Sequence, residues 1–165
     1  MSAASNVPDL RGISSRALVE VLEALVSLSA MEVRRAVGTA GGVAGPGFGA
    51  TVAMCGERIS GEVHLDLPES FAREASARLL GPFDATSADA TQLMDFAGEL
   101  ANMVAGRMAA SLDAAGFPCR LGTPVVGCGP GRRGSSELDA GGTQTDWICE
   151  GHRLTLEVRC ILRPS

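Results

Sequence analysis

The stretch Asp95-Phe-Ala-Gly-Glu99-Leu-Ala-Asn102-Met-Val-Ala-Gly106 lies near the middle of the longest helix that the sequence predicts. This helix is expected to run from about Ala88 to Ala115, with Ser87 as its N-cap and with Gly116 and Pro118 after its end. At roughly 100° per residue, one arc of the helix collects apolar side chains and is predicted to be buried. Its members are Leu93, Met94, Phe96, Ala97, Leu100, Val104, Met108 and Leu112.

The opposite arc of this helix carries a carboxylate and a carboxamide on neighbouring turns, Glu99 and Asn102. Small residues beside this pair are predicted to let the surface of another molecule approach closely. An ordinary solvated helix face is the alternative interpretation. However, Gly98, Asn102 and Gly106 all lower helix propensity, which indicates a function beyond folding. The polar arc comprises Gln92, Asp95, Glu99, Asn102 and Gly106, with Ala101, Ala105 and Ala109 beside it.

Composition limits the class of protein. The 165 residues suffice for one domain with a sizeable core. All fourteen basic residues are arginine, which excludes a P-loop lysine and a Schiff-base lysine. The net charge of −5 argues against a nucleic-acid partner. No segment is apolar over the roughly 18 residues of a membrane helix, and the first residues lack a signal-peptide pattern. We therefore expect a cytoplasmic protein with no membrane partner.

Cysteine and histidine do not form a recognisable metal or redox motif. The five cysteines are odd in number and lack a Cys-x-x-Cys pair, so neither a disulfide framework nor a zinc ribbon is predicted. The two histidines, His64 and His152, lack metal-ligand spacing and are expected to be solvated or hydrogen-bonded. No metal or cofactor site of the chain's own is predicted. Four cysteines are expected to be small core residues: Cys55, Cys128, Cys149 and Cys160.

The remaining pattern predicts an α+β fold, an antiparallel sheet with helices packed on one face. Residues 1–12 are expected to be a flexible tail and residues 13–165 a single domain. Helices are predicted from Ser14 or Ser15 to Ser29 and directly after Pro68. Strands are predicted over 50–55, 61–67, 120–126, 144–150 and 154–162, with residues 56–58 turning a hairpin. Residues 31–37 have a composition compatible with a strand but an ambiguous period. The glycine-rich segments 38–49 and 127–142 are expected to be connections, since no Gly-Lys-Ser/Thr follows the first.

Alternation within these elements predicts which side chains are buried. In the strand over 61–67, one face is apolar and the other polar, so one is expected in the core and one in water. The helix after Pro68 is expected to bury Phe71, Ala75 and Leu79. The apolar strand face holds Val63, Leu65 and Leu67, and the polar face Glu62, His64 and Asp66.

These elements and motifs together resemble the CheX-like chemotaxis phosphatases of the CheC, CheX and FliY group. The resemblance extends over roughly Ile13 to Arg163 and is carried by Glu62-Val-His-Leu-Asp-Leu-Pro68, Arg78-Leu-Leu-Gly81 and the strand through Thr123-Pro124. Its most specific part is Gly98-Glu-Leu-Ala-Asn-Met-Val-Ala-Gly106, a Glu-x-x-Asn motif in which the flanking glycines and apolar positions match as well.

The resemblance implies hydrolysis of the aspartyl phosphate on a response-regulator receiver domain such as CheY. By motif position, Glu99 and Asn102 would be the catalytic residues. Glu99 would pair with a lysine of the receiver, and Asn102 would orient the attacking water. The receiver would supply Mg²⁺ and the phosphate-binding groups. Asp95, Gly98 and Gly106 are expected to contact this partner.

The first predicted helix has Glu23-Ala-Leu-Val26, with valine where a second motif would need asparagine, so a single site is implied. The resemblance also implies a homodimer. Two other functions stay open at this point. One is a non-catalytic module that binds a receiver or a flagellar-switch protein, and the other is a domain unrelated to signalling.

Overall fold

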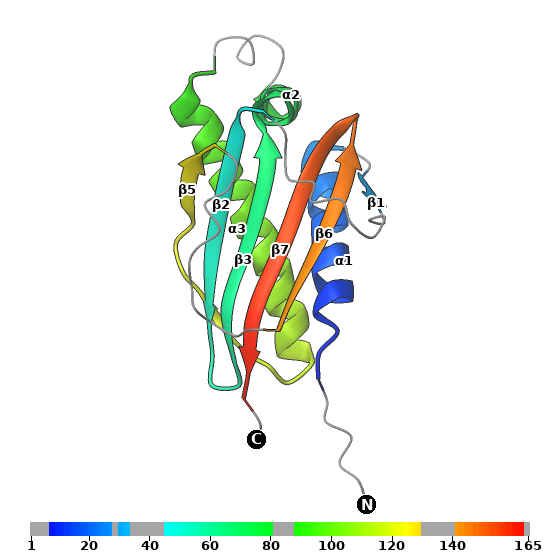
Figure 1. Cartoon of the computed structure of the whole chain (residues 1–165), viewed down its shortest axis with the longest axis vertical. Helices are drawn as coiled ribbons and strands as arrows, with labels where there is room; N and C mark the ends of the chain where they lie inside the picture. Colours follow the sequence, from blue (N-terminus) through cyan, green and yellow to red (C-terminus); the bar gives the residue numbers. More distant parts are fainter. Residues whose placement is uncertain (1–6, 28–29, 34–44, 81–87, 130–140, 164–165) are drawn as a thin grey trace, which may run out of the picture.

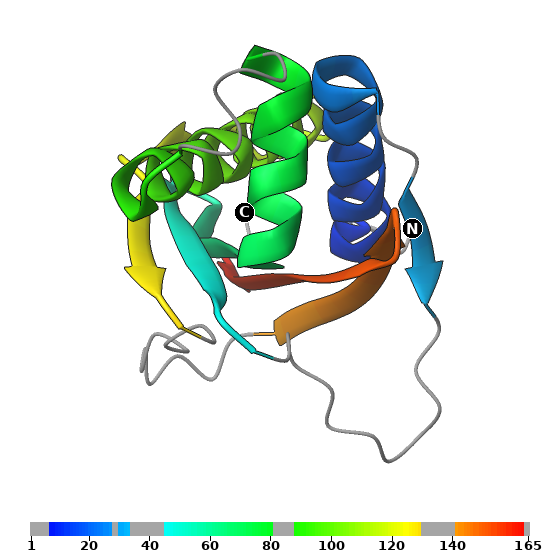
Figure 2. The same cartoon turned by 90° about the horizontal axis from the view of Figure 1, so that it is seen from above.

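Helices cover one face of an antiparallel sheet in the computed structural model, which describes residues 7–27, 30–33, 45–80, 88–129 and 141–163 (Figures 1 and 2). The described helices are α1 (Leu10–Val26), α2 (Glu69–Leu80) and α3 (Ala90–Ala114). The described strands are β1 (Ala30–Val33), β2 (Gly47–Cys55), β3 (Ile59–Pro68), β4 (Arg120–Leu121), β5 (Val125–Cys128), β6 (Gly141–Cys149) and β7 (His152–Leu162). The predicted α+β fold class is confirmed.

The strands pair in the order β1-β6-β7-β3-β2-β4, and β5 pairs with another part of the same edge of β2. The predicted hairpin is confirmed: β2 and β3 pair antiparallel, with Val52 opposite Val63, and the Gly56 amide donates to the Ile59 carbonyl at 2.8 Å. The predicted strand over 120–126 is wrong in one respect, because it divides into β4 and β5. Pro124 stands at this break and has no amide hydrogen to donate to a ladder.

The core lies between the sheet and the helices. As predicted, Val63, Leu65 and Leu67 of β3 are fully buried. Phe71 and Ala75 of α2 are also buried, whereas the prediction for Leu79 is wrong, since it is 40% exposed in the last turn. The polar sheet face is drier than predicted. His64 is only 7% exposed, and its ring nitrogens lie 2.7 Å from Thr51 Oγ1 and 3.0 Å from Asp66 Oδ1.

The first helix begins earlier than predicted. Asp9 caps α1 by accepting a hydrogen bond from the Gly12 amide at 2.9 Å, so the helix starts at Leu10 rather than after Ser14 or Ser15. An aspartate is as good an N-cap as serine, and Gly12 is tolerated in the first turn. Residues 1–6 of the predicted tail and residues 28–29 of the predicted helix end lie outside the described residues, and so do residues 34–37 of the segment 31–37. The same holds for residues 38–44 and 130–140 of the glycine-rich segments.

The cysteine predictions are confirmed for Cys149, the last residue of β6, and for Cys160 in β7. Cys149 and Cys160 are buried, and this burial raises the pKa of their thiols to about 11 and about 12 respectively. Cys55 and Cys128 are exposed, which corrects the prediction that they belong to the core.

Candidate functional site

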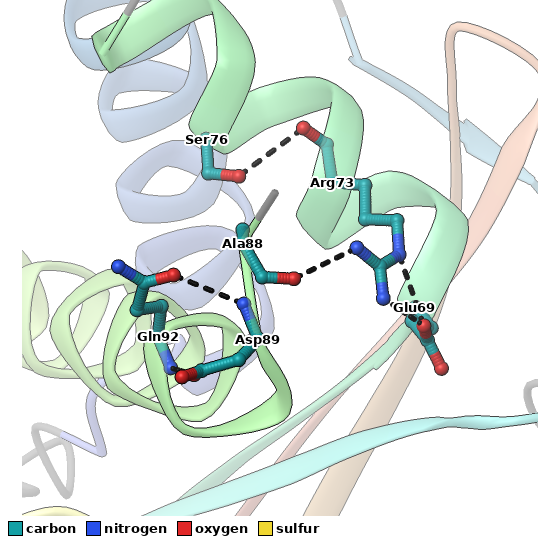
Figure 3. Close-up of polar contacts among 6 residues, drawn as sticks. All are labelled: Glu69, Arg73, Ser76, Ala88, Asp89 and Gln92. Atoms are coloured by element: carbon teal, nitrogen blue, oxygen red, sulfur yellow. Dashed lines mark hydrogen bonds and ion pairs between the residues drawn. The ribbon is translucent and has the colours of Figure 1, made fainter. Parts of the chain in front are cut away.

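The N-terminus of α3 is fixed by a capping box and by an arginine of α2 (Figure 3). The Asp89 side chain accepts from the Gln92 amide at 2.9 Å, and the Gln92 side chain accepts from the Asp89 amide at 3.0 Å. Asp89 is therefore the N-cap, which corrects the prediction of Ser87. Arg73 donates to the Ala88 carbonyl at 2.9 Å and pairs with Glu69 at 2.7 Å, so it joins the start of α3 to α2.

A second arginine fixes the other end of α3. Gly116 has a φ of +84°, the left-handed conformation in which glycine ends many helices. Its carbonyl accepts a hydrogen bond from Arg58 Nη1 at 3.0 Å, and the Arg58 guanidinium lies 4.3 Å from the centre of the Phe117 ring. Arg58 belongs to the β2–β3 turn, so α3 is connected to the sheet at one end and to α2 at the other. The helix is a rigid platform for the side chains on its exposed face.

The buried face of α3 is wider than the predicted arc. Ala101 and Ala105, expected beside the polar pair at the surface, are fully buried, and Gly98 is buried with them. A Cβ atom at Gly98 would lie 3.1 Å from Val126 Cγ2 and 3.7 Å from Pro124 Cβ. The small residues therefore allow β5 and the segment before it to approach α3. The helical pattern alone does not reveal this partner, because periodicity within one helix does not indicate which other element packs against it.

The exposed face of α3 presents the predicted polar pair. Glu99 and Asp95 are exposed, whereas Asn102 and Gly106 are half-buried. Within the described residues, the side chains of Asp95, Glu99 and Asn102 have no hydrogen-bond or ion-pair partner. These three side chains therefore differ from the paired polar side chains elsewhere in the described part of the chain.

An open hollow of about 490 Å³ adjoins Glu99 between α3 and the β4–β5 segment. We call it the α3–β5 hollow. Thr123 and Pro124 entered the sequence analysis only as part of the family resemblance, and their place beside α3 was not predicted, since only the fold brings them there. Its lining consists of Met94, Asp95, Gly98, Glu99, Thr123, Pro124 and Val126.

A different polar cluster joins α2 to the start of β7, and its side chains are paired with one another. His152 Nε2 donates to Glu74 Oε2 at 2.8 Å, and His152 Nδ1 lies 3.1 Å from Ser70 Oγ. This hydrogen bond from His152 is the main reason that the pKa of Glu74 lies below its usual value of 4.5. Arg78 also donates to Glu74, at 3.1 Å. We call this set the α2–β7 cluster.

Other site types are not found in the part of the chain that the structure describes. It contains no group of three or more histidine, cysteine or acidic side chains placed to hold a metal ion. Nor is any described helix long and apolar enough to cross a membrane.

Comparison with known proteins identifies similar families and structures. Residues 48–140 match the sequence profile of a family described as "Chemotaxis phosphatase CheX". No curated protein matches the chain by sequence. Among solved structures, the chemotaxis protein CheX from Vibrio vulnificus matches with a TM-score of 0.80 at 19% identity, covering 96% of this chain and 100% of that one. A CheC-like superfamily protein from Shewanella matches with a TM-score of 0.75 at 18% identity, covering 98% and 99%.

A third structure contains a partner protein. The CheX-CheY-BeF3-Mg²⁺ complex from Borrelia burgdorferi matches with a TM-score of 0.60 at 14% identity, covering 92% of this chain and 97% of that one. At such identities, the structural matches establish a shared fold.

Proposed function

The chain belongs to the CheX family of chemotaxis phosphatases, and we propose that it hydrolyses the aspartyl phosphate of a CheY-like receiver domain with Glu99 and Asn102. The observation that supports this assignment most is the state of the two side chains. Both project from a helix fixed at its two ends, and neither has a partner among the described residues. A side chain that must reach into another protein needs this freedom.

Asn102 is proposed to position the attacking water. A carboxamide is far too weak a base to deprotonate water, so its contribution is to hold the water in line with the bond to phosphorus. Its half-buried position limits the orientations that the amide can take. Such positioning acts on the transition state, so loss of Asn102 should lower kcat.

Glu99 is proposed to pair with a lysine of the receiver and so to place α3 over the phosphoryl group. Glu99→Gln should therefore raise KM more than it lowers kcat. Mg²⁺ and the groups that hold the phosphoryl group would come with the receiver, just as the Borrelia structure contains Mg²⁺ and BeF3 together with CheX and CheY. Homodimerisation and a cytoplasmic location stay predictions.

The test is phosphate release from Mg²⁺-loaded, phosphorylated receiver domains of the same organism. We would compare the parent protein, Asn102→Ala, Asp113→Ala and no added protein. Asp113 is exposed on the last turn of α3 and serves as the matched control. Acceleration by the parent and by Asp113→Ala, with loss in Asn102→Ala, is the expected result.

Other outcomes assign other functions. Acceleration that persists in Asn102→Ala would remove the role proposed for this residue. Binding of a receiver without acceleration would make the chain a non-catalytic receiver-binding module, and failure to bind any receiver would contradict the proposal as a whole.

A further inference from the structure

The α3–β5 hollow has two walls of different chemistry. On α3, Asp95 and Glu99 lie one turn apart and form an acidic rim. Met94, Pro124 and Val126 form an apolar wall, and Gly98 lies between the two without a side chain. No arginine of the described residues lines the hollow. Its volume of about 490 Å³ is many times the roughly 30 Å³ share of a water molecule, so it has room for a side chain of another protein.

The acidic rim favours a cationic partner. Two like charges at positions i and i+4 destabilise a helix by a few tenths of a kcal/mol, and within the described residues no cation relieves this repulsion. A positive group brought by another molecule gains from both carboxylates. The chain as a whole carries a net charge of −5, which also favours approach of a positively charged surface.

The apolar wall favours a partner that also carries an apolar side chain. Met94 and Val126 are half-buried and line a hollow that stays open to solvent. An apolar side chain seated there would release water from both surfaces. Met94 can adapt to the shape of an occupant, since its thioether side chain is flexible.

We propose that the α3–β5 hollow receives an apolar side chain that lies next to the lysine of the receiver, and that this second contact contributes to the affinity for the receiver. The inference rests on the proposed function, because Glu99 is shared by the site and the rim. It adds Met94, Asp95, Thr123 and Val126 as residues that determine affinity, apart from the chemistry assigned to Asn102.

Thr123 is the position at which this proposal is best tested. It lines the hollow and is exposed, so Thr123→Trp fills the hollow with little cost to folding. Ser111→Trp is the matched control. Ser111 is also an exposed hydroxyl residue, and it lies 12 positions after Glu99 on α3, about 18 Å along the helix axis.

The measurement is the Kd for receiver domains loaded with BeF3 and Mg²⁺, together with KM and kcat for phosphate release. Thr123→Trp should raise Kd and KM about tenfold and leave kcat at saturation near that of the parent. Ser111→Trp should change none of these. Asp95→Arg should also raise Kd and reduce the dependence of Kd on salt, because it removes attraction to the cationic group.

Each outcome distinguishes this inference from the proposed function. Equal receiver affinity of Thr123→Trp and parent would overturn the inference and leave the phosphatase proposal standing. Receiver binding that Thr123→Trp weakens, without turnover by the parent, would support the hollow and overturn hydrolysis. A parent protein that binds no receiver would overturn both.

Discussion

The α2–β7 cluster and the polar pair on α3 both contain a glutamate with a polar neighbour, but they differ in whether these side chains are hydrogen-bonded within the chain. In the α2–β7 cluster, both ring nitrogens of His152 have partners, and Glu74 accepts from His152 and Arg78. On α3, Glu99 and Asn102 have no partner within the described residues. The side chains of the first cluster are engaged with one another, which predicts a structural role, whereas the second pair is the one for which we propose a role in binding another protein.

The anchoring of α3 at both ends bears on the entropy cost of binding through Glu99 and Asn102. Arg73 and Arg58 fix the two ends of α3, so the backbone of this helix is ordered during folding, and the entropy still to be lost on binding is mainly that of the exposed side chains. Free side chains on a mobile loop would lose more entropy when a partner orders them. The contrast therefore predicts that changes in the α3 pair affect activity and changes in the α2–β7 cluster affect stability.

The largest expected effect is that of Asn102→Ala on turnover. We expect kcat for phosphate release to fall about 100-fold, because water positioning is lost. The free energy of unfolding should rise by a few tenths of a kcal/mol, since alanine is a better helix former than asparagine and no hydrogen bond is lost within the described residues. Phosphate release and urea unfolding measure the two effects. A marked loss of stability in this variant would contradict the prediction that changes in the α3 pair affect activity and not stability.

His152→Ala should show the opposite pattern. It removes contacts to Ser70 at 3.1 Å and to Glu74 at 2.8 Å, and the edge-on packing against Phe71. We expect a loss of about 1–2 kcal/mol in the free energy of unfolding, measured by urea titration. The kcat at saturating receiver should stay at the parent value. If kcat fell tenfold while stability was unchanged, the α2–β7 cluster would belong to the functional machinery.

The sequence predicted the α3 pair and not the α2–β7 cluster, for a physical reason. Glu99 and Asn102 are three positions apart on one helix, where periodicity alone places them together. His152 is 78 positions after Glu74, and only the pairing of β6 with β7 and the packing of α2 bring them into contact. The fold class followed from alternation in β3 and β7, whereas the start of α1 was missed because Pro8 and Gly12 favoured a tail, although Asp9 caps the helix.

The glycines of α3 show the same limit of sequence reasoning and supply the next prediction. A Cβ at Gly106 would have nothing within 4 Å, whereas one at Gly98 would crowd Val126. Gly106→Ala should therefore raise the free energy of unfolding by about 1 kcal/mol. At Gly98 the crowding of Val126 should cancel or reverse this gain. Thermal unfolding measures both.

Receiver binding by Gly106→Ala tests whether Gly106 contacts the partner. If Gly106 meets the partner, Gly106→Ala should raise Kd despite its added stability. An unchanged Kd would remove Gly106 from the contact surface and would leave Glu99 and Asn102 unaffected.

The smallest expected effect concerns acid stability and Glu74. The pKa of Glu74 lies below its usual value of 4.5 mainly because His152 donates a hydrogen bond to the carboxylate, with Arg78 adding to the effect and desolvation opposing it. A carboxyl whose pKa is lower in the folded than in the unfolded protein stabilises the fold at pH values above its unfolded pKa. That contribution is lost as the pH falls through the pKa of Glu74 in the folded protein, because the protonated carboxyl group is a weaker acceptor for the hydrogen bond from His152.

The free energy of unfolding of the parent should therefore decrease as the pH falls below about 4.5, and Glu74→Gln should decrease less steeply there. The difference should be about 0.5 kcal/mol or less, because the side chain is 38% exposed and solvent weakens the interaction. Urea unfolding between pH 3 and pH 6 measures it. Glu23→Gln is the matched control, since Glu23 is exposed and has no ion pair among the described residues. An equal pH dependence of the free energy of unfolding for parent and Glu74→Gln would mean that the hydrogen bond from His152 to Glu74 adds nothing measurable to stability. The structural role predicted for the α2–β7 cluster would then be contradicted.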